Sequence, residues 1–220
     1  MTFPDKKFAS VAEYAGAYFD QGKAAAASVD AEKLEAAFVC LDAAYERGGM
    51  VYVCGNGGSA SISNHLVCDH SKGGQTDTDL RPKVVSLSTN MEMITAIAND
   101  ISFDDIFVYQ LRTLAEDGDM LITISSSGDS ENIVRAAGWA KEKGLDVIAF
   151  TGFDGGRSAK LATINLHVEG DNYGVVEDTH QSLMHILAQY IRLKRMDDGT
   201  IHERKFQRPA RRRPVKPCPI

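Results

Sequence analysis

The stretch that most constrains the fold of this chain is VYVCGNGGSA, residues 51–60. Its first four residues are apolar, too few for a helix and rich in strand-forming types, so they predict a short buried strand. The glycines that follow allow a sharp turn, and Ser59 can cap a helix that continues to residue 70. Free backbone N–H groups at a helix start favour phosphate. This glycine turn (residues 55–59) by itself predicts a phosphate site only weakly, because it lacks the P-loop lysine and the G-x-G-x-x-G spacing. An ordinary tight turn between a strand and a helix has the same pattern.

Apolar segments alternate with helical segments along the rest of the chain. We expect strands at 83–88, 120–125, 146–151 and 163–168, and helices at 91–98, 104–114, 131–143 and 176–196. Continuous apolar strands between helices predict a parallel sheet that is covered on both faces. Ligands bind such sheets beyond the carboxyl ends of the strands, where the strand order reverses, and the glycine turn lies at such an end.

Two other regions flank this core. Residues 8–47 have a helical apolar period and predict two amphipathic helices with a break near Ser28, Val29 and Asp30. Seven arginines and lysines gather in residues 204–220, which have too few apolar residues to bury much surface. We therefore divide the chain into three parts. These are a helical segment at 1–50 that packs on the core and at an oligomer interface, an α/β core at 51–198, and a basic Pro/Arg-rich tail at 199–220.

Composition and charge limit the class of protein. With 44% hydrophobic and 25% charged residues, the chain has the make-up of a globular protein. No apolar run approaches the roughly 20 residues of a membrane span, and the first residues lack the apolar core of a signal peptide. We therefore expect a cytoplasmic protein without membrane contact. The formal net charge of −6 argues against nucleic-acid binding over the whole surface, and a nucleic-acid arm is the less common use of a basic tail.

A second polar turn follows the expected strand at 120–125. Four serines fall within residues 125–130, the serine turn, with Gly128 between them and a helix behind. Hydroxyls and free N–H groups at a helix start can surround a phosphate without a lysine. Helix capping accounts for one serine or two, so four serines favour a phosphate site over a cap alone.

Two helices carry imidazoles and carboxylates at helical spacing. His65 and Asp69 are four residues apart and share one helix face, as do Glu177, Gln181 and His185 on the last helix. If the two helices meet, they supply a two-histidine, two-carboxylate site for a metal such as zinc, or an acid and a base for proton transfer. Each pair taken singly is typical of a polar helix face, and no spacing rule brings the two helices together.

Five motifs in this order resemble the SIS (sugar isomerase) domain family, and more narrowly its phosphoheptose isomerases. They are VYVCGNGGSA at 51–60, ND at 99–100 with FDDIF at 103–107, ISSSGDS at 124–130, TGFDGG at 151–156 and HQSLMHIL at 180–187. The likeness covers about residues 8–195. It implies a flavodoxin-like α/β fold, with a five-stranded parallel sheet flanked by helices and with N-terminal helices. It also implies a homotetramer with active sites at subunit interfaces.

The resemblance further assigns roles to residues of this chain. Phosphate would be bound by Ser125, Ser126, Ser127 and Ser130. The sugar would be bound by Gly57, Gly58, Ser59, Asn99, Asp100 and Glu177. One zinc ion per subunit would be bound by His65, Asp69, Glu177 and His185.

Two of these four metal positions depart from the family pattern. Asp69 stands where the family has its catalytic glutamate, and Glu177 stands where it has glutamine. Because Asp is one methylene shorter, the reacting group is displaced, and a shift of ~1 Å can reduce a rate on the order of a hundredfold. Glu177 adds a carboxylate that can serve as ligand or base, and the set still suits zinc. The base, Asp69 or Glu177, and the metal both stay open on these grounds.

We predict an enzyme that isomerises sedoheptulose 7-phosphate to D-glycero-D-manno-heptose 7-phosphate through an enediol. Asp69 or Glu177 is the expected base, and His185 the expected proton shuttle. One alternative is an isomerase of another sugar phosphate, a pentose or a hexose. The other is a non-catalytic SIS protein that binds a phosphosugar or the replication initiator DnaA. The altered carboxylates and the basic tail favour the non-catalytic protein, whereas the retained histidines, acids and serine turn favour the enzyme.

Overall fold

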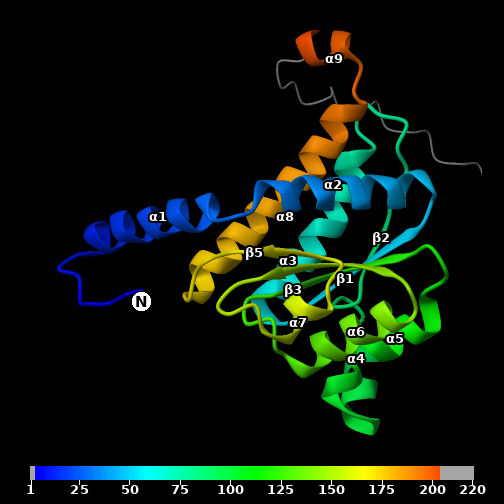
Figure 1. Cartoon of the computed structure of the whole chain (residues 1–220), viewed down its shortest axis with the longest axis horizontal. Helices are drawn as coiled ribbons and strands as arrows, with labels where there is room; N and C mark the ends of the chain where they lie inside the picture. Colours follow the sequence, from blue (N-terminus) through cyan, green and yellow to red (C-terminus); the bar gives the residue numbers. More distant parts are fainter. Residues whose placement is uncertain (1–2, 204–220) are drawn as a thin grey trace, which may run out of the picture.

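The computed structural model, which describes residues 3–203, contains a five-stranded parallel sheet. Its strands are β1 (Met50–Gly55), β2 (Lys83–Ser86), β3 (Met120–Ser125), β4 (Asp146–Thr151) and β5 (Ile164–His167). Their order across the sheet is β2-β1-β3-β4-β5 (Figure 1). Since β2 lies on one side of β1 and β3 on the other, the strand order reverses between β1 and β3, where folds of this type bind ligands. The flavodoxin-like sheet expected from the sequence is confirmed.

Helices cover both faces of this sheet, because alternate strand residues point to opposite faces. Val51 and Val53 belong to the core on one face, together with residues of α2 (Ala31–Glu46), α3 (Gly57–Cys68) and α8 (Tyr173–Arg195). Tyr52 and Cys54 belong to the core on the other face, with residues of α4 (Met91–Asp100), α5 (Val108–Leu114) and α6 (Glu131–Glu142). Figure 1 shows the two helical layers on either side of the sheet. The layer formed by α2, α3 and α8 carries His65 and His185, the two histidines of the predicted metal site.

The N-terminal helices begin and end as the sequence predicts. α1 (Val11–Ala27) starts after Ser10, whose hydroxyl accepts a hydrogen bond from the Glu13 N–H. α2 starts after Asp30, whose carboxylate caps two N–H groups of the first turn. The break at residues 28–30 is thus confirmed. In Figure 1, α1 extends away from the sheet, and its Tyr18 hydroxyl donates to Asp178 of α8 at 2.7 Å.

The structure differs from the sequence-based expectations in short elements. The expected helix at 104–114 is a 3₁₀ turn, η2 (Phe103–Asp105), followed by α5. α7 (Gly156–Leu161) was not expected, because six residues are too few for a clear period. The helix expected to continue to residue 70 ends at Cys68 and is followed by a π-helical turn, η1 (Asp69–Gly73). α9 (Asp198–Glu203) falls where the basic tail was expected, and residues 204–220 lie outside the described residues. Within residues 3–203, no helix combines the length and apolar character that a membrane crossing requires.

Candidate active site

The glycine turn and the serine turn lie side by side at the point where the strand order reverses. Gly55 at the end of β1 pairs with Ile124 of β3, so the two turns leave neighbouring strands at the same edge of the sheet. Asn56 and Asn132 tie them together, because each side-chain amide donates to the other's carbonyl, at 2.9 and 3.0 Å. The sequence predicted both turns at this edge, and the amide pair fixes their spacing.

Gly58, in the glycine turn, has a packing reason to be glycine. A Cβ added there would overlap the carboxylate of Glu177, which reaches it from α8. Gly57 has a φ of +52°, in the left-handed region that favours glycine. Asn56 makes no side-chain capping bond to α3, so the helix start is not covered by its own cap. Burial raises the pKa of Glu177 above its ordinary value, and the nearby charge of Asp178 acts in the same direction.

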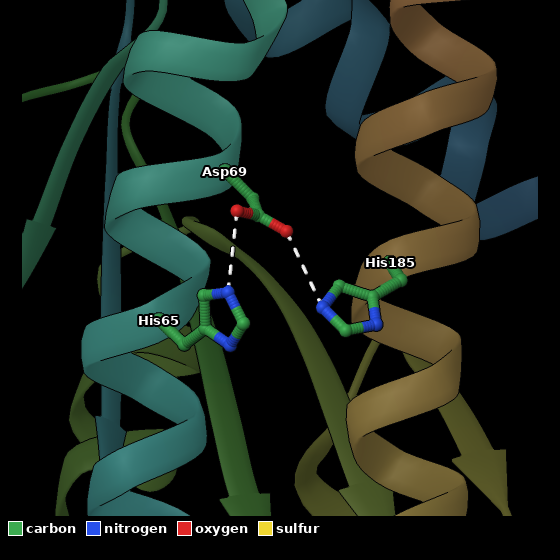
Figure 2. A group of neighbouring side chains, drawn as sticks. All are labelled: His65, Asp69 and His185. Atoms are coloured by element: carbon green, nitrogen blue, oxygen red, sulfur yellow. Dashed lines mark ion pairs between the residues drawn. The ribbon is translucent and has the colours of Figure 1, made fainter. Parts of the chain in front are cut away.

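Further along the contact between α3 and α8, two histidines and a carboxylate converge. Asp69 Oδ1 lies 3.3 Å from His65 Nε2, and Asp69 Oδ2 lies 3.4 Å from His185 Nε2. Figure 2 shows the Asp69 carboxylate between the two rings, with His65 and Asp69 on one helix and His185 on the other. One ligand atom from each residue lies within 4.8 Å of the others. The arrangement is a possible metal site, and it answers the question that spacing left open, because the two helices do meet.

Gln181 joins this group, and the resemblance had not assigned it a role. Its Nε2 lies 3.1 Å from His65 Nδ1 and 3.1 Å from His185 Nε2, within hydrogen-bond distance of both rings. The helical spacing had placed Gln181 on the same face as Glu177 and His185, which was the available signal. Glu177, one turn earlier on α8, is not among the clustered ligand atoms, because its carboxylate lies against Gly58 instead. The structure therefore brings together three of the four predicted metal ligands, with Gln181 rather than Glu177 beside them.

The serine turn has more hydroxyls than its own backbone uses. Ser125 Oγ accepts from the Gly128 N–H at 3.2 Å, and Ser127 Oγ accepts from the Asp129 N–H at 3.4 Å. Ser126 Oγ is buried without a hydrogen-bond partner among the described residues. Ser130 is the N-cap of α6 but makes no side-chain capping bond. Helix capping therefore does not explain all four serines. A buried hydroxyl without a hydrogen-bond partner among the described residues is instead consistent with binding of a polar ligand or a water molecule.

A cavity of about 670 Å³ lies beside the serine turn, but its walls are acidic. Ser127 lines it together with four carboxylates, those of Asp129, Asp154, Glu169 and Asp171. Arg157 is close, but its guanidinium binds Asp129 and Glu131. Since like charges repel, this cavity disfavours a phosphate. A phosphate at the serine turn would bind more favourably on the side that faces the glycine turn, away from these carboxylates.

Asn99 and Asp100 lie apart from the other predicted residues. They form the last turn of α4, on the sheet face opposite to α3 and α8. Both are exposed, and the Asn99 amide donates to Asp100 at 2.7 Å. Their predicted contact with the sugar stays a prediction.

Comparisons with known proteins agree with this geometry. Residues 17–152 match the model of the SIS domain family. A probable phosphoheptose isomerase of Thermoplasma acidophilum is 34% identical over 175 residues, which are 79% of this chain and 95% of the relative. The phosphoheptose isomerase of Nitratidesulfovibrio vulgaris is 40% identical over 142 residues, 64% of this chain and 68% of the relative. Among solved structures, phosphoheptose isomerase GmhA from Neisseria gonorrhoeae has a TM-score of 0.76 and 31% identity, over 83% of this chain and 98% of its own.

Proposed function

This chain belongs to the SIS domain family and, within it, to the phosphoheptose isomerases, and we propose that it interconverts sedoheptulose 7-phosphate and D-glycero-D-manno-heptose 7-phosphate. The family assignment confirms the resemblance seen in the sequence motifs. The observation that carries the proposal is the contact of His65, Asp69 and His185 between α3 and α8, in a chain that spans 95% of a 34%-identical relative. The protein is thus an aldose–ketose isomerase.

We assign the base of the reaction to Glu177. The base takes a proton from C1 of the ketose, which leaves an enediol, and returns it to C2, while a second proton moves from O1 to O2. No oxidant or reductant is consumed. Glu177 faces the glycine turn, where the sugar is expected to bind, whereas Asp69 is engaged by both histidines. The raised pKa of Glu177 brings it nearer to neutral pH, which suits a residue that both accepts and returns a proton.

His185 is the residue we assign to the transfer between the sugar oxygens. Its Nε2 lies within 3.4 Å of Asp69 and 3.1 Å of Gln181, so the ring orientation is fixed by two partners. Asp69 would hold the ring in this orientation rather than act as the base.

Zinc is the metal we propose for this site, one ion per subunit. His65, Asp69 and His185 would hold it, since one ligand atom from each lies within 4.8 Å of the others and imidazole nitrogens and a carboxylate oxygen suit zinc. The amide of Gln181 offers an oxygen at the same place if its oxygen and nitrogen are exchanged. When bound, the metal supplies Lewis-acid polarisation of a sugar oxygen. Glu177 is the fourth predicted ligand. Because its carboxylate lies against Gly58, we assign it the role of base instead.

The phosphate of the substrate is assigned to the serine turn. Ser126 and Ser130 have hydroxyls that no capping bond occupies, and Ser125 and Ser127 complete the ring of donors. Gly57, Gly58 and Ser59 would bind the sugar between this phosphate site and the histidines. Binding the far end of the substrate supplies orientation for the reacting carbons.

A homotetramer with active sites at subunit interfaces is the assembly we propose. Exposed apolar side chains on α1 and α8 support it, among them Phe19 at 72%, Ile186 at 48% and Leu193 at 47% exposure. Asn99 and Asp100 also bear on the assembly. Because they lie exposed on the opposite face of the sheet, we propose that they contact the sugar bound by a neighbouring copy of the chain.

The experiment that tests the function is turnover of sedoheptulose 7-phosphate by the full chain after chelation, with and without added Zn²⁺. Zinc-dependent formation of the aldose is the expected result. Binding of the sugar phosphate without turnover would contradict the isomerase and favour a non-catalytic protein. Turnover of a pentose or hexose phosphate alone would keep the reaction but replace the substrate.

A further inference from the structure

The helix that carries Asp69 changes its hydrogen bonding at that residue. α3 ends at Cys68, and the chain continues as the π-helical turn η1 (Asp69–Gly73), in which the Gly74 N–H donates to the carbonyl of Asp69. π-helical turns are rare and occur often at functional sites. This turn begins at Asp69, the residue whose side chain contacts His65 and His185.

His70, the next residue, points the other way and is buried, with 2% of its surface exposed. Its Nδ1 is hydrogen-bonded to the hydroxyl of Tyr45 on α2 at 2.8 Å. The ring also lies beside the backbone of Met184 on α8, although its Nε2 has no partner within strict hydrogen-bond geometry among the described residues. Met184 directly precedes His185. The His70 ring thus contacts both α2 and the segment of α8 that carries the second histidine.

This arrangement matters because Asp69 has a short side chain. Its carboxylate must span two imidazoles on different helices, and a shift of ~1 Å at such a site can reduce a rate on the order of a hundredfold. We propose that Tyr45 and His70 are positioning residues, which hold the π-helical turn against α8 so that Asp69 reaches both His65 and His185. The inference rests on the proposed function, because it presumes that these three residues act together.

Removal of the Tyr45 hydroxyl tests the proposal with a minimal change. In Tyr45→Phe, His70 Nδ1 is left buried without a partner, so the ring is free to shift and η1 with it. Tyr52→Phe is the matched control, because the Tyr52 hydroxyl donates to the Leu114 carbonyl at 2.8 Å on the other face of the sheet. Both variants lose one hydrogen bond of a largely buried tyrosine, but only Tyr45→Phe loses the contact with η1.

The first readout is the affinity of the metal-stripped full chain for Co²⁺ alone, followed by its visible absorption, and the second is kcat and KM for sedoheptulose 7-phosphate. Tyr45→Phe is expected to weaken Co²⁺ binding about tenfold and to lower kcat with KM within about twofold, in the range seen for residues that orient metal ligands. Tyr52→Phe is expected to match the wild type in both. Equal Co²⁺ affinity in Tyr45→Phe and wild type, or equal losses in both variants, would overturn the positioning role.

A second background separates positioning from general stability. In Asp69→Glu, the longer side chain can make up for a displaced turn, so Tyr45→Phe is expected to cost less there than in the wild type, a coupling that a double-mutant cycle measures. Additive losses would contradict the inference. Wild-type protein that binds no Co²⁺ and shows no turnover would contradict the proposed function itself, and the inference with it, before any variant is compared.

Discussion

The two ends of α3 each face a carboxylate, and the two carboxylates lie in different surroundings. At the start of the helix, Glu177 lies against Gly58, and burial and the charge of Asp178 raise its pKa. At the end, Asp69 lies between His65 and His185, within 3.4 Å of each. Asp69 thus faces two imidazoles, whereas Glu177 is partly buried beside another carboxylate, which disfavours its anionic form. This difference supports the two proposed roles, a metal ligand at one end and a base at the other.

The two ends of α3 also differ in what holds the nearby carboxylate in position. The start depends on missing side chains, because Gly58 leaves the space that Glu177 fills. At the end, side chains are present that we propose to hold Asp69 in place, because Tyr45 of α2 is hydrogen-bonded to His70, the residue after Asp69. Substitutions that add atoms should therefore displace the carboxylate at the start of α3. Substitutions that remove atoms should displace the carboxylate at its end.

The largest expected effect comes from Glu177→Gln, which keeps the shape and removes the base. We expect kcat to fall by about 10²–10⁴-fold, the range for loss of a general base, with Co²⁺ affinity within a few-fold of wild type. Asp69→Asn should instead lose Co²⁺ affinity, because it removes the anionic ligand. Steady-state kinetics and metal titration on both variants check the division of roles, and an active Glu177→Gln enzyme would reassign the base to Asp69.

Gly58→Ala should reduce kcat/KM on the order of a hundredfold, because the added methyl displaces the Glu177 carboxylate from the glycine turn. Gly138→Ala is the matched control. Gly138 lies in α6 with nothing within 4 Å of an added Cβ, so this change is expected to be neutral or slightly stabilising. Kinetics and thermal unfolding of both variants are the measurements. If Gly58→Ala kept full activity, the carboxylate would not need its present position.

Ser126→Ala should raise KM for the sugar phosphate about tenfold with little change in kcat, because it removes a hydroxyl assigned to the phosphate and not to the reacting carbons. Its thermal stability should not fall, since the Ser126 hydroxyl has no protein partner among the described residues. Ser158→Ala provides the control, because the Ser158 hydroxyl on α7 is also buried and has no partner within residues 3–203, but lies outside the serine turn. An unchanged KM in Ser126→Ala would count against the phosphate assignment.

The smallest expected effect is on pH dependence. The basic form of Glu177 is lost as pH falls through its pKa, which its surroundings raise above the ordinary 4.5. Asp178→Asn removes the negative charge that contributes to this rise but keeps an oxygen that can accept from Tyr18. The acidic limb of the kcat/KM profile should therefore move to lower pH by less than about one unit. A limb that does not move, or moves upward, would contradict Glu177 as the titrating base.

Much of this arrangement could be read from the sequence. The alternation of apolar strands and helices predicted the parallel sheet, because each period is a local property of the chain. The glycine and serine turns were placed at the same edge for the same reason, and the spacing of His65 and Asp69 put them on one face. Asp30 and the break before it were equally local, since a cap depends only on its own first turn.

Only the tertiary structure decided which of these residues meet. Spacing put Glu177, Gln181 and His185 on one face of α8, but the axial offset of α8 against α3 puts Gln181 beside the histidines and Glu177 beside Gly58. Likewise, the π-helical turn after Cys68 and the Tyr45–His70 contact depend on the packing of α2 and α8 around η1. A helix period fixes the direction of each side chain within its own helix. The relative position of two helices is set by packing between residues far apart in sequence, which no local pattern encodes.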